Sequence, residues 1–165
     1  MQINFGNHVL PGEAQKHKFV GFNPGLLEQA KLVALSIEYL KVRSTYCNPI
    51  MCDEGFKSLP KHHTFDEVLN NKNVWISFGS DRGDLANGNT WLGLTINNDE
   101  KNYDIAINTW AFTCVKNKAT RVQEIAAILV HEMAHVNGAP NDTHTAEMML
   151  MFCGFGEYYE PTVIG

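Results

Sequence analysis

Residues 120–140, TRVQEIAAILVHEMAHVNGAP, carry the clearest helical pattern in the chain. The apolar residues of this stretch recur at intervals of three and four, which is the spacing of one face of an α-helix. These residues are Val122, Ile125, Ala126, Leu129, Met133 and Val136. Thr120, with Gln123 three residues later, matches a capping box and predicts the start of the helix. Gly138 and Pro140 are typical of a helix end.

Within this helix lies the pattern HEMAH, from His131 to His135. Positions four apart lie on one helix face, so both imidazoles can bind one ion at about 2.0–2.1 Å. Glu132 is rotated by about 100° from its neighbour, which leaves its carboxylate free to contact a water on the metal. The HExxH pattern on a helix therefore predicts a zinc site with His131 and His135 as ligands and Glu132 as general base.

Other helices are expected before and after this one. Residues 25–42 carry apolar side chains at helical spacing and predict a long amphipathic helix. Residues 43–63 contain two prolines and a glycine, which favours a loop. A short helix is expected over 64–70, capped by its threonine. A last helix is expected over 142–154, beginning at its aspartate or at the threonine that follows.

Three strands are expected in the middle of the chain. VWISFG (74–79) and TWLGLTIN (90–97) flank a polar loop that contains glycine, which predicts a hairpin. YDIAIN (103–108) alternates apolar and polar residues and predicts the third strand. The order of helix, strands and two helices predicts an α+β fold, a small mixed or antiparallel sheet packed on the HExxH helix.

The length and composition suit one folded domain. The 165 residues are 44% hydrophobic and 19% charged, which is ordinary for a globular protein. We expect a single domain over 1–165, with the first helix and the sheet in 1–119 and the metal-binding helices in 120–165. The net charge of −5 disfavours nucleic-acid and anionic-membrane partners, because there is no basic surplus to bind phosphates.

The sequence is compatible with more than one localisation. No apolar run approaches the 18 or more residues that cross a bilayer, so membrane insertion is not expected. The start, MQINFGNHVLPGEAQK, lacks a basic segment followed by an apolar one and does not match a signal peptide. We expect a protein that stays in the cytoplasm, has lost its signal, or leaves by a non-classical secretion machinery.

The remaining candidate ligands have ordinary interpretations. The four cysteines, Cys47, Cys52, Cys114 and Cys153, are expected to be free thiols, with a local disulfide between the first two as the alternative. No pair of CxxC motifs indicates a zinc ribbon. The four histidines outside the C-terminal region are expected to be solvated or without partners; they are His8, His17, His62 and His63.

The HExxH helix resembles that of the zincin metallopeptidases, which place it beneath a mixed sheet. In the metzincins the pattern continues as HExxHxxGxxH; here Gly138 matches the glycine, but Asn141 stands at the third histidine. In the gluzincins a glutamate arrives from a later helix, and Glu147 is the candidate. The deuterolysin-type aspzincins have an aspartate nine residues after the second histidine, and His144 stands there in this chain.

The third ligand is therefore expected to be His144, with Glu147 and Asp142 as alternatives. The eight residues between His135 and His144 can span up to about 27 Å, enough to return to the ion. His144 and Glu147 are three apart, so whichever does not bind metal can orient a group that does. In the resembled family a tyrosine supports the oxyanion; Tyr158 and Tyr159 are the substitutes offered here.

The resemblance implies a zinc-dependent peptidase with one Zn²⁺ and a protein or cell-wall peptide as substrate. The substrate backbone is expected to add to an edge strand of the sheet, TWLGLTIN or YDIAIN. Small domains of this type also resemble toxins of bacterial secretion systems, which implies an effector with an inhibitor or immunity protein as partner. The alternative is a zinc-containing binding module without turnover, and Glu132 disfavours it because such a module needs no base.

Overall fold

The computed structural model describes residues 1–79, 93–97, 101–112, 118–141 and 144–158. Its helices are α1 (Gly12–Lys16), α2 (Leu27–Lys41), α3 (Pro49–Lys57), α4 (Phe65–Leu69), α5 (Lys118–Val136) and α6 (Thr145–Phe152). Its strands are β1 (Gln2–Ile3), β2 (Phe19–Val20), β3 (Val74–Gly79), β4 (Gly93–Asn97) and β5 (Tyr103–Asn108). Short 3-10 turns cover Pro24–Leu26, Arg43–Thr45, Thr109–Phe112 and Gly156–Tyr158. None of the described helices is long and apolar enough to cross a membrane.

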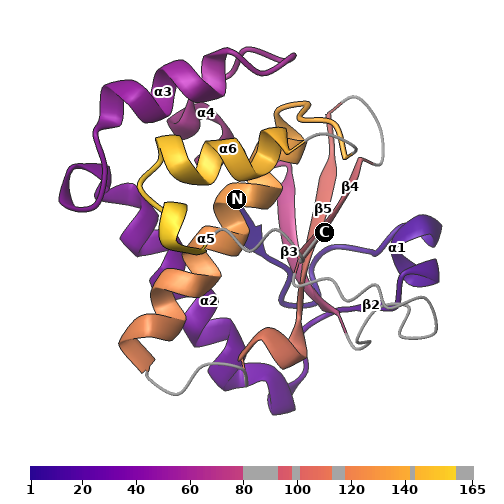
Figure 1. The fold of residues 1–165 in the computed structure, drawn as a ribbon. Coiled ribbons are helices and arrows are strands. Elements are labelled where there is room, and N and C mark those ends of the chain that lie inside the picture. Colours follow the sequence, from indigo (N-terminus) through magenta and orange to yellow (C-terminus); the bar gives the residue numbers. More distant parts are fainter. Residues whose placement is uncertain (80–92, 98–100, 113–117, 142–143, 159–165) are drawn as a thin grey trace.

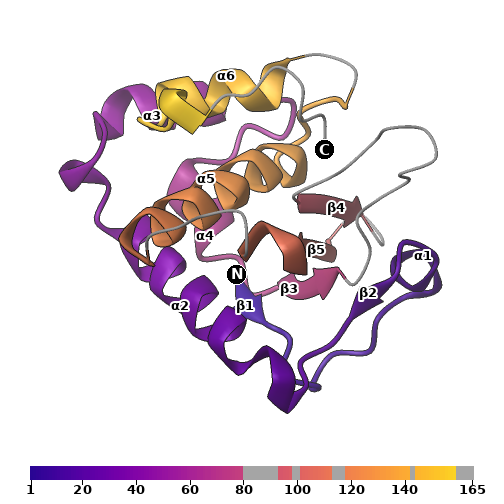
Figure 2. The same cartoon turned by 60° about the horizontal axis from the view of Figure 1, so that its bottom comes forward.

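The fold is α+β, as the sequence predicts. Figures 1 and 2 show α2 and α5 covering one face of the sheet, with α3 and α6 beyond them. α4 lies beside these helices, with the carbonyl oxygen of its Leu69 bonded to the N-terminal amine of Met1. The N-terminal α1 and β2 lie toward the opposite face, where Ala14 and Phe19 pack on Ile96 and Ala106 of the sheet. The HExxH helix is thus held between a sheet and a second layer of helices.

The sheet is mixed and its order differs from the predicted one. The strands lie in the order β1-β3-β5-β4, with β2 paired to β3 off this path. β3 and β5 run parallel over six residue pairs, and β4 pairs antiparallel with the other side of β5. The predicted hairpin between 74–79 and 90–97 is therefore wrong. β5 lies between β3 and β4, and every one of its residues is buried, as is typical of a strand inside a sheet that is covered on both faces.

This order also corrects the expected substrate edge. YDIAIN is β5 and lies inside the sheet, so the prediction that it offers a free edge is wrong. β4 is the last strand in the described order, and its exposed Asn97 and half-buried Leu94 and Thr95 fit that place. Of the two strands predicted to pair with a substrate, only β4 is at an edge.

α2 and α4 agree with the local patterns, whereas α1 and α3 were not predicted. α2 and α4 form where predicted, and Thr64 makes the expected capping box with Glu67. The predicted loop over 43–63 is wrong, because it contains α3. Asn48 caps this helix by accepting hydrogen bonds from the backbone N–H groups of Ile50 and Met51, and Pro49 takes the first helical position. A proline there needs no N–H partner and starts a helix rather than ending one.

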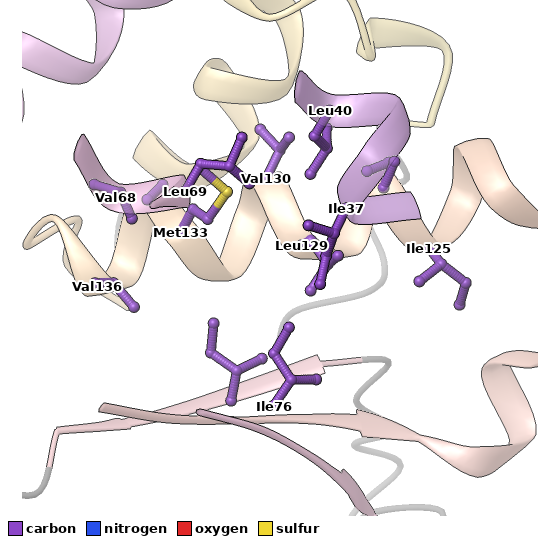
Figure 3. Close-up of a cluster of buried hydrophobic side chains, with 14 of the residues drawn as sticks. Ile37, Leu40, Val68, Leu69, Ile76, Ile125, Leu129, Val130, Met133 and Val136 are labelled. Atoms are coloured by element: carbon purple, nitrogen blue, oxygen red, sulfur yellow. The ribbon is translucent and has the colours of Figure 1, made fainter. Parts of the chain in front are cut away.

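The core is built around α5. Figure 3 shows its side chains between Ile76 of β3 and the side chains of α2 and α4. The buried residues of α5 include Ile125, Leu129, Val130, Met133 and Val136, most of which belong to the predicted apolar face. The helix begins at Lys118, two residues before the predicted capping threonine, and ends at Val136 before Gly138. This packing fixes both the axis and the rotation of the helix that carries HExxH.

Candidate metal centre

The two predicted histidine ligands face each other on α5. Nε2 of His131 lies 3.0 Å from Nε2 of His135, and both side chains are half-buried. Two nitrogens that bind one tetrahedral zinc at about 2.0–2.1 Å are about 3.3 Å apart. The helical spacing thus brings the two ring nitrogens to nearly the separation that a shared ion requires.

The turn after α5 orients the His135 ring. Nδ1 of His135 lies 2.9 Å from the carbonyl oxygen of Ala139. A carbonyl only accepts, so Nδ1 carries the hydrogen and a neutral ring keeps its lone pair on Nε2, toward His131. Gly138 makes this possible with φ +94°, a left-handed conformation that turns the chain back over the helix end. The donor chemistry of the pair fits a zinc ion.

Glu132 points to the sheet side of the helix. Its side chain is only 1% exposed, and its Oε2 accepts a 2.5 Å hydrogen bond from the Thr95 hydroxyl on β4. No sequence pattern indicates this partner, because the contact depends on which strand lies beside α5. The expected general base is therefore a buried carboxylate held against the edge strand of the sheet.

The third ligand is not brought to the two histidines in the part of the chain that the structure describes. His144 is the N-cap residue of α6 and is exposed, and Glu147 lies one turn further with 9% of its surface exposed. Among the described residues, no three histidine, cysteine, aspartate or glutamate side chains form a group that could hold a metal. Asp142 lies outside the described residues. The assignment of His144 stays a prediction.

Asn137 links the end of α5 to the end of α3 and to the segment that follows α3. Its buried side-chain amide donates to the carbonyl oxygens of Phe56 and His63, at 2.8 and 3.0 Å, and its oxygen accepts from the His63 N–H. The side chains of His62 and His63 are exposed, as expected. Asn137 thus supports the metal-site helix two residues after His135, a role that no sequence motif indicates.

His8 has a partner that the sequence did not predict. Its Nε2 lies 2.9 Å from Oδ1 of Asp104, a fully buried carboxylate on β5, and its ring stacks on Trp75 at 4.5 Å. The expectation of an unpartnered His8 is wrong, because the N-terminal segment folds onto the sheet. Asp104 shares a sheet face with Ile96, opposite the face that packs on α5. This pair is therefore separate from the candidate metal centre.

Tyr158 is engaged away from the histidines. Its hydroxyl donates to the side-chain oxygen of Gln123, at 2.9 Å, and burial raises the pKa of Tyr158 to about 12. Gln123 precedes His131 by eight residues, about 12 Å along the helix. This position offers no support for Tyr158 as the oxyanion donor, and Tyr159 lies outside the described residues.

The cysteines correct the thiol prediction. Cys52 of α3 and Cys153 at the end of α6 form a disulfide with Cα atoms 4.6 Å apart, whereas Cys47 is free. The expectation of four free thiols is therefore wrong, and so is the local bridge between Cys47 and Cys52. The helices meet closely here: a Cβ on Gly55 would lie 3.1 Å from the ring of Phe152. Cys114 lies outside the described residues.

Burial also affects the pKa of the free thiol of Cys47. It raises the pKa of Cys47, although the nearby Arg43 guanidinium acts in the opposite direction. A thiol with a raised pKa carries little thiolate at neutral pH and reacts slowly. The surroundings of Cys47 therefore do not activate it as a nucleophile.

Comparisons with known proteins returned no relatives: no family model matches the chain, and neither a curated protein nor a solved structure matches it significantly.

Proposed function

We propose that this chain is a zinc-dependent hydrolase of peptide bonds. The observation that carries the proposal is the pair of imidazoles on α5, whose Nε2 atoms lie 3.0 Å apart. The hydrogen bond from His135 to Ala139 supports it, because in the neutral ring it places the hydrogen on Nδ1 and the lone pair on Nε2, the nitrogen that faces His131. The mixed sheet with an antiparallel edge strand beside the helix is compatible with the zincin arrangement that the sequence resembles.

Glu132 supplies the acid–base chemistry in this proposal. A zinc ion bound at the histidine pair would polarise the scissile carbonyl and lower the pKa of a water to about 7. The Glu132 carboxylate takes a proton from the attacking water and passes it to the leaving amide nitrogen. The burial of this carboxylate keeps bulk water from competing for the proton, which supports a catalytic role for Glu132.

We further propose that the substrate adds to the side of β4 opposite β5, which has no partner among the described strands. This strand ends the described sheet and touches the general base through Thr95. Backbone pairing with a protein or a cell-wall peptide would then bring a scissile bond toward the histidine pair. The disulfide favours a protein that works in an oxidising environment, which supports export.

The first test is metal-dependent cleavage. Protein dialysed against zinc is incubated separately with unfolded casein and with purified peptidoglycan, and new amino groups are counted and mapped by mass spectrometry. We expect one of the two to be cleaved, cleavage to stop when a chelator removes the metal, and zinc to restore it. Fully zinc-loaded protein that cleaves neither substrate would contradict the proposal and favour a zinc-containing binding module.

The third ligand has a separate test. We expect His144→Ala to weaken zinc binding by about 100-fold or more. The loss of a group that only orients a ligand already lowers metal affinity by about 10–100-fold. Zinc content after dialysis is measured for His144→Ala, Glu147→Ala and, as control, the exposed His62→Ala. Full zinc content in His144→Ala together with loss in Glu147→Ala would assign the glutamate instead.

A further inference from the structure

The environment of Glu132 is built by one strand. The Thr95 hydroxyl lies 2.5 Å from Oε2 of Glu132 and 3.3 Å from its backbone carbonyl oxygen. A donor at 2.5 Å from a carboxylate oxygen is a short, charge-assisted hydrogen bond when the carboxylate is ionised. Thr95 therefore fixes one of the two oxygens of the expected general base.

The other carboxylate oxygen lies where a side chain on β4 would have to be. A Cβ built on Gly93 would lie 2.6 Å from Oε1 and 2.9 Å from Cγ of Glu132, and 2.8 Å from Cγ2 of Ile128. Real Cβ atoms essentially never approach other atoms so closely. Only a glycine at position 93 therefore lets the Glu132 carboxylate lie against β4 without a shift of the neighbouring atoms.

Both residues belong to the same face of β4. Gly93 pairs with Ile107 and Thr95 with Ile105, whereas Leu94 between them faces the N-terminal segment on the opposite side of the sheet. Alternate residues of a strand share a face, so the pleat itself places the bare position and the hydroxyl two residues apart beside α5. The strand thus bonds one oxygen of Glu132 through Thr95 and leaves space for the other at Gly93.

We propose that Thr95 is a positioning residue for Glu132, with Gly93 providing the space that this position needs. The inference rests on the proposed function, since it assigns Thr95 a part in the same reaction. A free glutamate side chain samples many rotamers, whereas a general base must stay within hydrogen-bond reach of the proton it takes. The hydroxyl of Thr95 selects the rotamer that places the carboxylate between the helix and the edge strand.

The test compares two substitutions at one position. Thr95→Val removes the hydroxyl and keeps the shape, whereas Thr95→Ser keeps the hydroxyl; Thr45→Val is the control, an exposed threonine on a remote turn. On whichever probe the wild type cleaves, unfolded casein or peptidoglycan, Thr95→Val is expected to lower kcat by about tenfold to a hundredfold. KM and zinc content are expected to stay at wild-type values, and Thr95→Ser to restore most of the rate.

A second measurement reads the contact without activity. Urea unfolding is followed for Thr95→Val in the wild type and in a Glu132→Ala background. In the wild type the substitution leaves a buried carboxylate without its donor, so the unfolding midpoint is expected to fall clearly. Without the carboxylate the same substitution is expected to shift the midpoint much less, as Thr45→Val does in both backgrounds.

The results of these experiments distinguish a failure of the positioning role of Thr95 from a failure of the proposed peptidase function. Wild-type cleavage that Thr95→Val fully retains, or equal midpoint shifts in the two backgrounds, would overturn the positioning role alone. A rate loss that Thr95→Ser does not restore would also overturn it, because the hydroxyl would then be irrelevant. A zinc-loaded wild type that cleaves neither probe would overturn the proposed function, and the positioning role would fall with it.

Discussion

Glu132→Gln is expected to lower kcat by about 10²–10⁴-fold while the zinc content stays at one ion per chain. The amide has nearly the shape of the carboxylate and can still accept the hydrogen bond from Thr95, so the local structure is retained. It cannot take a proton from water at neutral pH, so only the chemical step is lost. The measurement is turnover of the cleaved probe beside elemental analysis of the same sample.

The control is Glu38→Gln, an exposed glutamate on α2 that pairs with Lys41. It removes the same charge from the chain and is expected to leave turnover unchanged. Wild-type turnover in Glu132→Gln would show that another residue is the base. Loss of zinc in Glu132→Gln would instead show that this carboxylate is a zinc ligand. That result would contradict the expectation that Glu132 points away from the histidine pair.

Removing the disulfide is expected to have the largest effect on stability. Cys52 and Cys153 are fully buried and 101 residues apart, so their bond restricts most of the unfolded chain. The entropy of closing a loop of this size predicts a loss of about 4–5 kcal/mol in the free energy of unfolding for Cys52→Ser/Cys153→Ser. That is a large part of the total stability of a typical domain.

Urea unfolding with and without reductant measures this effect. The reduced wild type is expected to behave like the double variant, and Cys47→Ser to behave like the oxidised wild type, because Cys47 is free. Since α6 begins beside His144, unfolding of this helix on reduction is also expected to weaken zinc binding. An unchanged midpoint in the double variant would show that the bond adds nothing to the folded state.

Local patterns predicted the elements that depend on neighbouring residues. The apolar spacing of α2 and α5, the capping threonine of α4, the apolar residues of β3 and the alternating pattern of β5 all lie within short windows of sequence. The spacing of His131 and His135 is equally local, and the structure places their ring nitrogens within 3.0 Å. A helix fixes such relations before any tertiary contact forms.

The features that were missed depend on contacts between distant residues. The hairpin prediction failed because a fully buried strand, β5, inserts between β3 and β4, which only the assembled sheet reveals. The two-residue strands β1 and β2 are too short for any periodicity to show. The disulfide joins residues 101 apart, and the contact between Thr95 and Glu132 spans 37 positions. No window of sequence contains both partners of such a pair.

The claim on which all of this depends is that α5 presents two imidazoles to one divalent ion. Equilibrium dialysis against zinc at neutral pH, followed by elemental analysis, tests it most directly on the wild type, His131→Ala and His135→Ala. We expect one zinc per wild-type chain and a loss of zinc in each variant. A folded wild type that takes up no zinc, or variants that retain it fully, would show that the two imidazoles do not bind a shared ion.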